Sequence, residues 1–381
     1  MEIIAVIIFI AIVISVEVQI YKIKVLPNVE YDCFFSKKEV LEGETLEIIE
    51  TVINPSPFWV PCMKSEITTS KYLAFAENVS TTNDKNRSLA SLFDVKSKQK
   101  VRRAWKAKCF KRGVFKLEDT TIIGVDLFGY YHYSNIIKLG SKVTVLPRPI
   151  DISEYVNRVN EQQGDRVVKR FILEDPFEIA GVREYTTRDS MNKIHWGITA
   201  RQGQLMVRNN EATSKKSLTI LFNNQLSSEQ LKEPMHDERL ENGIRIAAGE
   251  IGKTIKTSTP VRLLANGGID EGEESIATEL MWGPAHVHEL FVLLSSVGDT
   301  FTEHFDKLIR RYETTIQSTE VIIITCYIDE PMLEFERNKR NQGIKTKFYL
   351  LSYEKDSKPY EDLEVYYLLD YLKEVGETNE A

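Results

Sequence analysis

The sequence predicts an α+β multidomain protein: an N-terminal transmembrane helix, an antiparallel β-sandwich and then a Rossmann-type α/β domain. The first observation is an almost unbroken apolar run over residues 3–20. The second is a series of short strands separated by Gly and Pro turns between residues 27 and 149. The third is the alternation of apolar strands with helical stretches from Ser217 onward, which is typical of a parallel sheet covered by helices. A chain of 381 residues is long enough for two or three domains.

The apolar run has the length of a membrane anchor. Its eighteen residues, with three polar interruptions, span about 27 Å as a helix, against roughly 30 Å of bilayer hydrocarbon. A cleaved signal peptide is the alternative, but no Lys or Arg precedes the run and no A-x-A site follows it. Lys22 and Lys24 follow directly. By the positive-inside bias we expect residues 1–24 to be a single-pass anchor in the cell membrane, with the bulk of the chain cytoplasmic.

Residues 25–150 are expected to form the β-sandwich. The stretch 45–57 alternates like a strand and ends at prolines, and the turn at 126–129 is followed by a strand over residues 130–133. The polar stretch 78–97 is expected to be a long loop. Short, evenly spaced strands of this kind indicate an antiparallel sandwich.

Residues 217–376 are expected to form the α/β domain, followed by an acidic tail over 377–381. Continuous apolar strands indicate a parallel sheet that is buried on both faces. The expected strands cover residues 217–223, 261–265, 320–327 and 346–352. The expected helices cover residues 235–251, 286–312, 331–340 and 363–375.

Charge and cysteine content restrict the class of protein. The net charge of −7 gives no reason to expect a nucleic-acid partner. The four cysteines show neither CxxC nor metal-ligand spacing, and we interpret them as small buried residues rather than disulfides or ligands: Cys33, Cys62, Cys109 and Cys326. Unpaired cysteines favour a reducing compartment.

The connector over residues 151–216 carries the most distinctive motif. A short polar helix is expected first, and residues 175–211 then read DPFEIAGVREYTTRDSMNKIHWGITARQGQLMVRNNE. This segment resembles the signature of the bacterial and archaeal DUF58 family. The matching positions are Gly181, Arg183, Glu184, Tyr185, Asp189, Ile194, Trp196, Ala200, Arg201, Gly203, Leu205, Val207 and Arg208. Three positions depart from the family's Gly, Arg and Asp: Arg188, Asn192 and His195.

The signature has two main interpretations. Its arginines alternate with Glu184, Asp189 and Glu211, and arginine forks suit bidentate carboxylate pairs. The preferred interpretation is an internal ion-pair network that clamps the segment to the α/β domain, with apolar anchors at Tyr185, Trp196, Leu205 and Val207. Replacing Arg201 or Trp196 would then destabilise the protein. The other interpretation is a recognition surface for a partner protein, and a catalytic role is the third.

The resemblance implies a von Willebrand A-like fold for residues 217–376 and a MoxR-type AAA+ ATPase as partner. Such domains commonly hold a divalent ion at the end of the first strand through D-x-S-x-S, because hard cations need oxygen ligands. Here Asn223 and Gln225 replace the aspartate and the first serine, and only Ser227 matches. We therefore expect a degenerate strand end with no metal and no cofactor, and Asp329 is too isolated to restore the site.

The remaining motifs give no catalytic constellation. Residues 249–254 resemble the end of a P-loop, but Ala247 stands where the P-loop pattern requires its first glycine. Gly249 and Gly252 are interpreted as a helix C-cap instead. His286 and His288 lie two residues apart, so on a helix they would point to different faces. His195 is interpreted as structural, and no serine or cysteine has a nucleophile context. The chain is not expected to be an enzyme.

These expectations combine into one functional hypothesis. The chain is predicted to be a membrane-anchored DUF58 protein that acts as an adaptor or chaperone-like assembly factor. Its N-terminal helix would contact membrane lipid, and its partner would be a MoxR-type AAA+ ATPase. The alternative is a hydrolase or another enzyme of cell-surface or transglutaminase-linked metabolism, which retained catalytic ligands would reveal.

Overall fold

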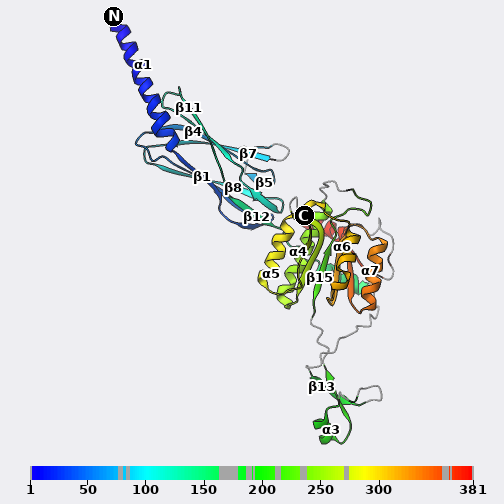
Figure 1. Ribbon diagram of the computed structural model, residues 1–381. Helices are drawn as coiled ribbons and strands as arrows, with labels where there is room; N and C mark the ends of the chain where they lie inside the picture. Colours follow the sequence, from blue (N-terminus) through cyan, green and yellow to red (C-terminus); the bar gives the residue numbers. More distant parts are fainter. Residues whose placement is uncertain are drawn as a thin grey trace. The chain divides into compact units, whose positions relative to one another are not determined.

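The computed structural model describes residues 2–75, 80–82, 86–162, 179–185, 191, 194–210, 216–231, 238–269, 274–353, 360 and 363–379. The chain divides into two compact units (Figure 1). Unit 1 is Met1–Arg148 with Phe291–Val297, and unit 2 is Pro149–Leu290 with Gly298–Ala381.

Unit 1 begins with the apolar helix predicted from the sequence. Helix α1 (Glu2–Ile20) continues without a break into a π-helical turn, η1 (Tyr21–Val25), and a 3-10 turn, η2 (Leu26–Asn28). It is long and apolar enough to cross a membrane. Its apolar side chains up to Val16 are mostly exposed, whereas Tyr21, Val25 and Leu26 are buried in the core of the sandwich.

The β-sandwich predicted after this helix is present and is built mainly from antiparallel pairs. The sheet orders are β1-β3-β8-β5, β11-β10-β4-β7-β6 and β2-β12-β9, and the β2–β12 pair is parallel. The strands are β1 (Glu30–Phe35), β2 (Glu39–Leu41), β3 (Thr45–Ile53), β4 (Val60–Ser70), β5 (Leu73–Phe75), β6 (Ser80–Thr82), β7 (Asn86–Val95), β8 (Lys100–Cys109), β9 (Gly113–Lys116), β10 (Thr120–Val125), β11 (His132–Ile137) and β12 (Lys142–Leu146).

The long loop expected over residues 78–97 is wrong, because β7 occupies its second half. Leu89, Phe93 and Val95 pack into the core, and with the buried Ser91 they alternate with the exposed Ala90, Leu92 and Asp94. The surrounding polar residues concealed this period of two in the sequence. Pairing with β4 over nine registered positions stabilises the strand.

The four cysteines, all among the described residues, form no disulfide. Cys33, Cys109 and Cys326 are buried as expected, and Cys62 is half-buried. Burial raises the pKa of Cys33 to about 12 and that of Cys109 to about 11. Both thiols are therefore protonated near neutral pH, and they behave as small core residues.

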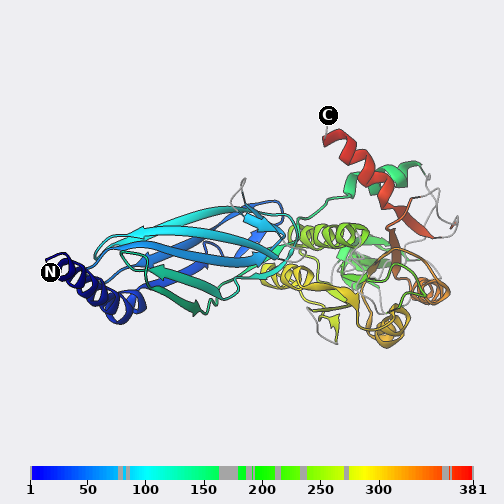
Figure 2. The same cartoon turned by 90° about the horizontal axis from the view of Figure 1, so that it is seen from above.

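Unit 2 begins with helix α2 (Ser153–Gln162), and the signature follows as an antiparallel pair of strands, β13 (Ile179–Glu184) and β14 (Met206–Asn210), on either side of helix α3 (Trp196–Gln202). The rest of the unit is a mainly parallel sheet with order β17-β16-β15-β19-β20-β21, and β18 also pairs with β16. Helices lie on both faces of this sheet, as Figures 1 and 2 show.

The sheet contains β15 (Leu218–Phe222), β16 (Val261–Ile269), β17 (Ser275–Ala277), β18 (Val297–Phe301), β19 (Glu320–Thr325), β20 (Lys345–Leu350) and β21 (Glu364–Tyr367). Its helices are α4 (Glu238–Thr257), α5 (Pro284–Ser295), α6 (Phe305–Tyr312), η4 (Glu313–Thr315), α7 (Glu330–Asn341) and α8 (Leu368–Asn379). The strand order reverses between β15 and β19, where the carboxyl ends of neighbouring strands form a crevice in folds of this type.

Two predicted helices are wrong in part. The stretch 286–312 contains β18 between α5 and α6, because Val297 and Phe301 are buried in the pairing with β16. The stretch 363–375 begins with β21, whose Glu364–Tyr367 segment pairs with β20 before α8 starts. Both strands are short apolar segments, for which periodicity does not separate helix from strand.

The glycines of residues 249–254 do not cap a helix, because α4 continues to Thr257. Gly249 instead allows the backbone of Ile150 to approach helix α4 closely. A Cβ at this position would lie 2.0 Å from the carbonyl oxygen of Ile150. The Ile150 N–H donates to the Arg245 carbonyl at 3.0 Å, and Lys253 pairs with Asp151 at 2.9 Å. The missing side chain lets the connector lie directly on α4.

Candidate functional site

The described part of the signature forms a small hairpin around helix α3. Arg183 is opposite Val207 in the β13–β14 ladder, and Gly181 adjoins an irregularity in its register. The Tyr185 N–H donates to the Leu205 carbonyl at 2.8 Å. An isolated bridge joins Ile194 to Val207. The matched spacing therefore encodes a local backbone fold.

Two matched or altered positions hold the ends of α3. His195 is the N-cap residue, and its side chain accepts from the Ile198 N–H at 3.4 Å. Gly203 is the C-cap residue at φ 72, a left-handed conformation that favours glycine. Thr199 accepts from the Met206 N–H through its Oγ1 at 3.0 Å. The interpretation of His195 as a structural residue agrees with this contact.

The hairpin has a very small interior. Ile194, Met206 and Val207 are buried, and the expected role of Val207 as an anchor to the α/β domain stays a prediction. The anchoring role expected for Trp196 and Leu205 is wrong: these side chains are 65% and 44% exposed. Two short strands and two helical turns bury only a few side chains.

The structure contradicts the proposed ion-pair network at Arg201. The side chain of Arg201 is exposed, so it does not complete a buried pair, and Tyr185 is half-buried. The network as a whole stays a prediction because its other members are not all described. Outside the described residues lie Arg188, Asp189, Asn192 and Glu211, and the side chains of Arg183 and Arg208 are likewise not described.

The degenerate metal position lies at the carboxyl end of β15, inside a buried network of amides. Asn266, from β16, donates to Asn223 Oδ1 at 3.3 Å, to Gln225 Oε1 at 3.2 Å and to the Glu303 carbonyl at 3.2 Å. Its own Oδ1 accepts from the Asn224 N–H at 2.6 Å. All four amide side chains are at most 2% exposed.

Neighbouring elements complete this amide network. Asn223 donates to Thr325 Oγ1 at 3.0 Å, and Gln225 Oε1 also accepts from the Phe305 N–H at 2.8 Å. The Gln225 Nε2 atom lies 3.1 Å from His304 Nδ1. Ser227, in contrast, is exposed, so the structure does not bring it into the network.

This arrangement does not fit a divalent cation. The side-chain oxygens of Asn223, Gln225 and Asn266 each already accept at least one N–H hydrogen bond. Asp329 caps helix α7 by accepting from the Met332 N–H at 3.2 Å, and burial raises its pKa. Among the described residues there is no group of three or more His, Cys, Asp or Glu side chains that could hold a metal ion.

We predict that Mg²⁺ or Mn²⁺ leaves the melting temperature of the detergent-solubilised chain unchanged after treatment with a chelator. A site filled at 100 times its Kd would add about 2.7 kcal/mol of stability. Differential scanning fluorimetry over a metal titration measures the effect. A saturable rise in melting temperature that Asn223→Ala abolishes would contradict the prediction.

The two histidines of the H-x-H motif lie in different environments. His286 is buried, with Nε2 at 2.9 Å from the Val261 carbonyl, whereas His288 is exposed. The two histidines thus differ in environment, as expected for helix positions two apart.

Sequence reasoning missed a buried carboxylate in the sandwich. Glu50, on β3, accepts hydrogen bonds from Tyr31 Oη at 2.8 Å and Trp105 Nε1 at 2.6 Å in its own sheet. Ser65 Oγ at 2.6 Å and Ser91 Oγ at 2.5 Å donate from the opposite sheet. Burial raises the pKa of Tyr31, and the Glu50 charge adds to the effect. The strand period was the available signal, because Glu50 falls in the buried series with Leu46, Ile48 and Val52.

Comparisons with known proteins do not place the chain in a family. No family model and no curated protein matches it. Solved structures that match include a type II cohesin domain from the cellulosome of Acetivibrio cellulolyticus (13% identity, 31% of this chain and 95% of that one, TM-score 0.23). A CARDB domain from Pyrococcus furiosus (13% identity, 29% and 93%, TM-score 0.19) and a cohesin module from Clostridium perfringens (11% identity, 29% and 99%, TM-score 0.19) also match. At these TM-scores the similarities carry no argument about fold or function.

Proposed function

We propose that this chain is a DUF58-type membrane-anchored adaptor or chaperone-like assembly factor that docks a MoxR-type AAA+ ATPase through its signature hairpin. The observation that carries the proposal is the exposure of Trp196, Leu205 and Met191 on a hairpin whose backbone is fixed by local hydrogen bonds. Large apolar side chains on a small ordered element are typical of binding hot spots, in which Trp is enriched.

The α/β domain is proposed to be von Willebrand A-like. The strand order, with its reversal beside β15, supports this assignment. In place of metal ligands, the strand end has amides that bond to each other. We infer that the domain is a scaffold that positions the hairpin and does not bind its partner through a metal ion.

The chain is proposed to reside in the cell membrane through helix α1, with the β-sandwich and unit 2 in the cytoplasm. Helix α1 supplies the span, and Lys22 and Lys24 follow its apolar part, which is the charge distribution of a cytoplasmic flank. An AAA+ ATPase in the cytoplasm would then have access to the hairpin.

We predict that Trp196→Ala weakens binding of the purified ATPase to the full chain at least tenfold. Truncation of a hot-spot residue costs about 2 kcal/mol or more of binding free energy, whereas exposed side chains contribute little to folding. The melting temperature should therefore change little, which reverses the destabilisation expected from the sequence alone. Surface plasmon resonance and thermal denaturation measure the two effects.

The matched control is Trp282→Ala, because Trp282 is also an exposed tryptophan of unit 2 but lies outside the signature. It should leave both quantities unchanged. If Trp196→Ala bound the ATPase normally, the docking role would be rejected. If it unfolded the protein instead, the clamp interpretation would be restored.

A further inference from the structure

The end of the sandwich next to helix α1 carries exposed aromatic and basic side chains on three loops. Residues 54–59 expose Phe58 and Trp59, and residues 126–131 expose Leu127, Phe128 and Tyr130. Residues 96–99 expose Lys96 and Lys98. These side chains, together with Lys22 and Lys24 of the helix itself, are called the collar below.

Direct contacts hold two of these loops against the helix. The Tyr21 hydroxyl donates to the Trp59 carbonyl at 2.5 Å, and its ring lies 6.3 Å from that of Phe58. One turn earlier on the same helix face, the Leu127 N–H donates to Glu17 Oε1 at 2.9 Å. Lys22 lies over the ring of Tyr131, with Nζ 5.9 Å from its centroid.

The basic loop is bonded to the first aromatic loop. The Lys98 N–H donates to the Ser56 carbonyl at 3.1 Å, and the Asn54 N–H donates to the Gln99 carbonyl at 2.9 Å. The indole N–H of Trp59 donates to Asp94 Oδ1, at the end of the strand that leads into the basic loop. The loops at 54–59 and 96–99 are therefore joined to each other, and the loop at 126–131 is bonded to the same face of the helix one turn earlier.

The length of the helix determines how deep this surface lies. Residues 3–20 span about 27 Å, so crossing roughly 30 Å of hydrocarbon requires the whole run. Glu17, to which the loop at 126–131 is bonded, lies about 4.5 Å before Ile20 along the helix axis. The loop tip with Phe128 must therefore lie at or below the membrane surface whenever α1 spans the bilayer.

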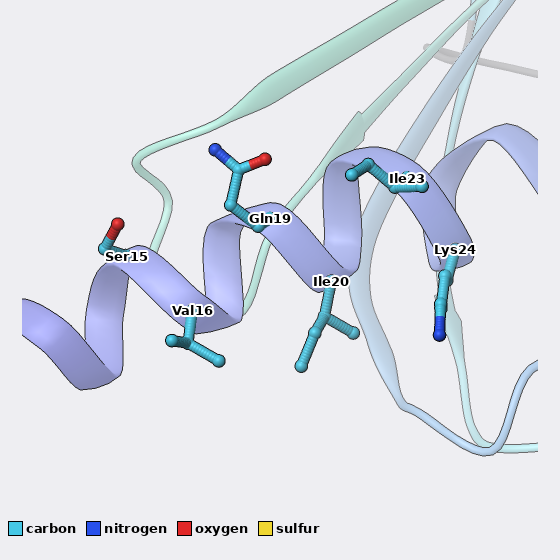
Figure 3. Close-up of a pocket in the computed structure, with 6 residues that line it drawn as sticks. All are labelled: Ser15, Val16, Gln19, Ile20, Ile23 and Lys24. Carbon is cyan, nitrogen blue, oxygen red and sulfur yellow. The ribbon is translucent and has the colours of Figure 1, made fainter.

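The helix itself has a groove at the same depth as the loop at 126–131. Ser15, Val16, Gln19, Ile20, Ile23 and Lys24 line a shallow groove of about 280 Å³ on α1 and η1 (Figure 3). Val16 and Ile20 belong to the last turns of the span, and Ile23 and Lys24 follow on the sandwich side. This order, apolar side chains followed by a cation, matches the passage from acyl chains to anionic headgroups.

We propose that the collar is a membrane-seating surface: its aromatic side chains enter the interface of the bilayer, and its lysines bind anionic headgroups. Aromatic residues are enriched at this level of membrane proteins, and clustered lysines beside a span favour anionic lipid. The inference rests on the proposed membrane anchoring. It adds that the sandwich is held at a defined height and orientation on the bilayer.

The test places an environment-sensitive fluorophore on single cysteines of the full chain, in a Cys62→Ser background, reconstituted in vesicles of phosphatidylcholine and phosphatidylserine. The positions are Phe128→Cys in the collar, Val13→Cys in the span and Phe110→Cys as control. Phe110 is a matched control because it is exposed on the sandwich and has Lys108 beside its ring, 5.3 Å from the centroid, but it follows β8 at the end where Cys109 pairs with Leu73.

Lipids with a quencher on the acyl chain should remove most of the emission at positions 13 and 128 and leave position 110 unaffected. Quenching at 13 but not at 128 would overturn the collar and leave the anchor intact. No quenching at 13 would overturn both the anchor and the collar.

A headgroup-labelled phosphatidylserine should quench position 128 more than the equivalent phosphatidylcholine does, and Lys96→Ala with Lys98→Ala should remove this difference. Equal quenching by both lipids in the unchanged collar would overturn its preference for anionic headgroups.

Discussion

Replacing Glu50 with leucine is expected to lower the free energy of unfolding of the sandwich by at least about 3 kcal/mol. The carboxylate is fully buried and accepts four hydrogen bonds from four different strands of two sheets. Its removal leaves Tyr31, Ser65, Ser91 and Trp105 without their acceptor, and each unsatisfied buried donor costs roughly 1–3 kcal/mol. Partial relaxation of the structure or entry of water would reduce the total cost of the four unsatisfied donors. The value of about 3 kcal/mol is therefore set below that total, as a lower bound.

The measurement is urea denaturation of the detergent-solubilised chain, followed by the fluorescence of Trp105 within the cluster. Glu50→Gln keeps one acceptor oxygen and should lose less stability than Glu50→Leu. The control is Glu47→Leu on the same strand, where the side chain is only half-buried. An unchanged midpoint for Glu50→Leu would mean that apolar packing replaces the carboxylate at no cost, as occurs for some buried ionic groups.

Replacing Asn266 with alanine is expected to destabilise unit 2 by about 2–4 kcal/mol, the cost of a few unsatisfied buried polar groups. This side chain bonds to Asn223, Gln225 and the Glu303 carbonyl, and it accepts from the Asn224 backbone. Because the network is buried, water cannot easily replace the lost partners.

Hydrogen exchange at the backbone amides of residues 223–225 measures this effect locally, alongside the melting temperature. Protection should fall at these amides and at Phe305, whose N–H bonds to Gln225. Ser227→Ala is the control, since this serine is exposed and should be neutral. A stable Asn266→Ala chain with unchanged protection would show that the amides do not act as one network.

Local patterns were enough for the elements with strong periodicity. The apolar helix after Glu2 and the buried strands near Leu218, Val321 and Phe348 follow from residue type over a few turns or a single strand. The burial of Cys33 and Cys109 followed from residue type in the same way. These features depend on contacts that are close in sequence or on burial of a whole apolar run, so one segment contains the necessary information.

Elements decided by pairing were predicted poorly. The β7 strand was concealed because Ser91 lies in its buried series and Leu92 in its exposed series. The strands β18 and β21 were read as parts of helices. Each of the three becomes a strand through its partner β4, β16 or β20. Gly249 was assigned to a helix end, although its role depends on a connector about one hundred residues away in the chain. No local pattern contains the position of that connector.

The candidate sites divide in the same way. The sequence by itself determined that Asn223 and Gln225 could not supply a carboxylate to a cation. Only the tertiary structure decided that Asn266 fills the strand end, that four strands meet at Glu50 and that Trp196 is exposed. The physical reason is that hydrogen-bond satisfaction and exposure depend on which distant segments the fold brings together, whereas ligand chemistry and backbone preference belong to the residue itself.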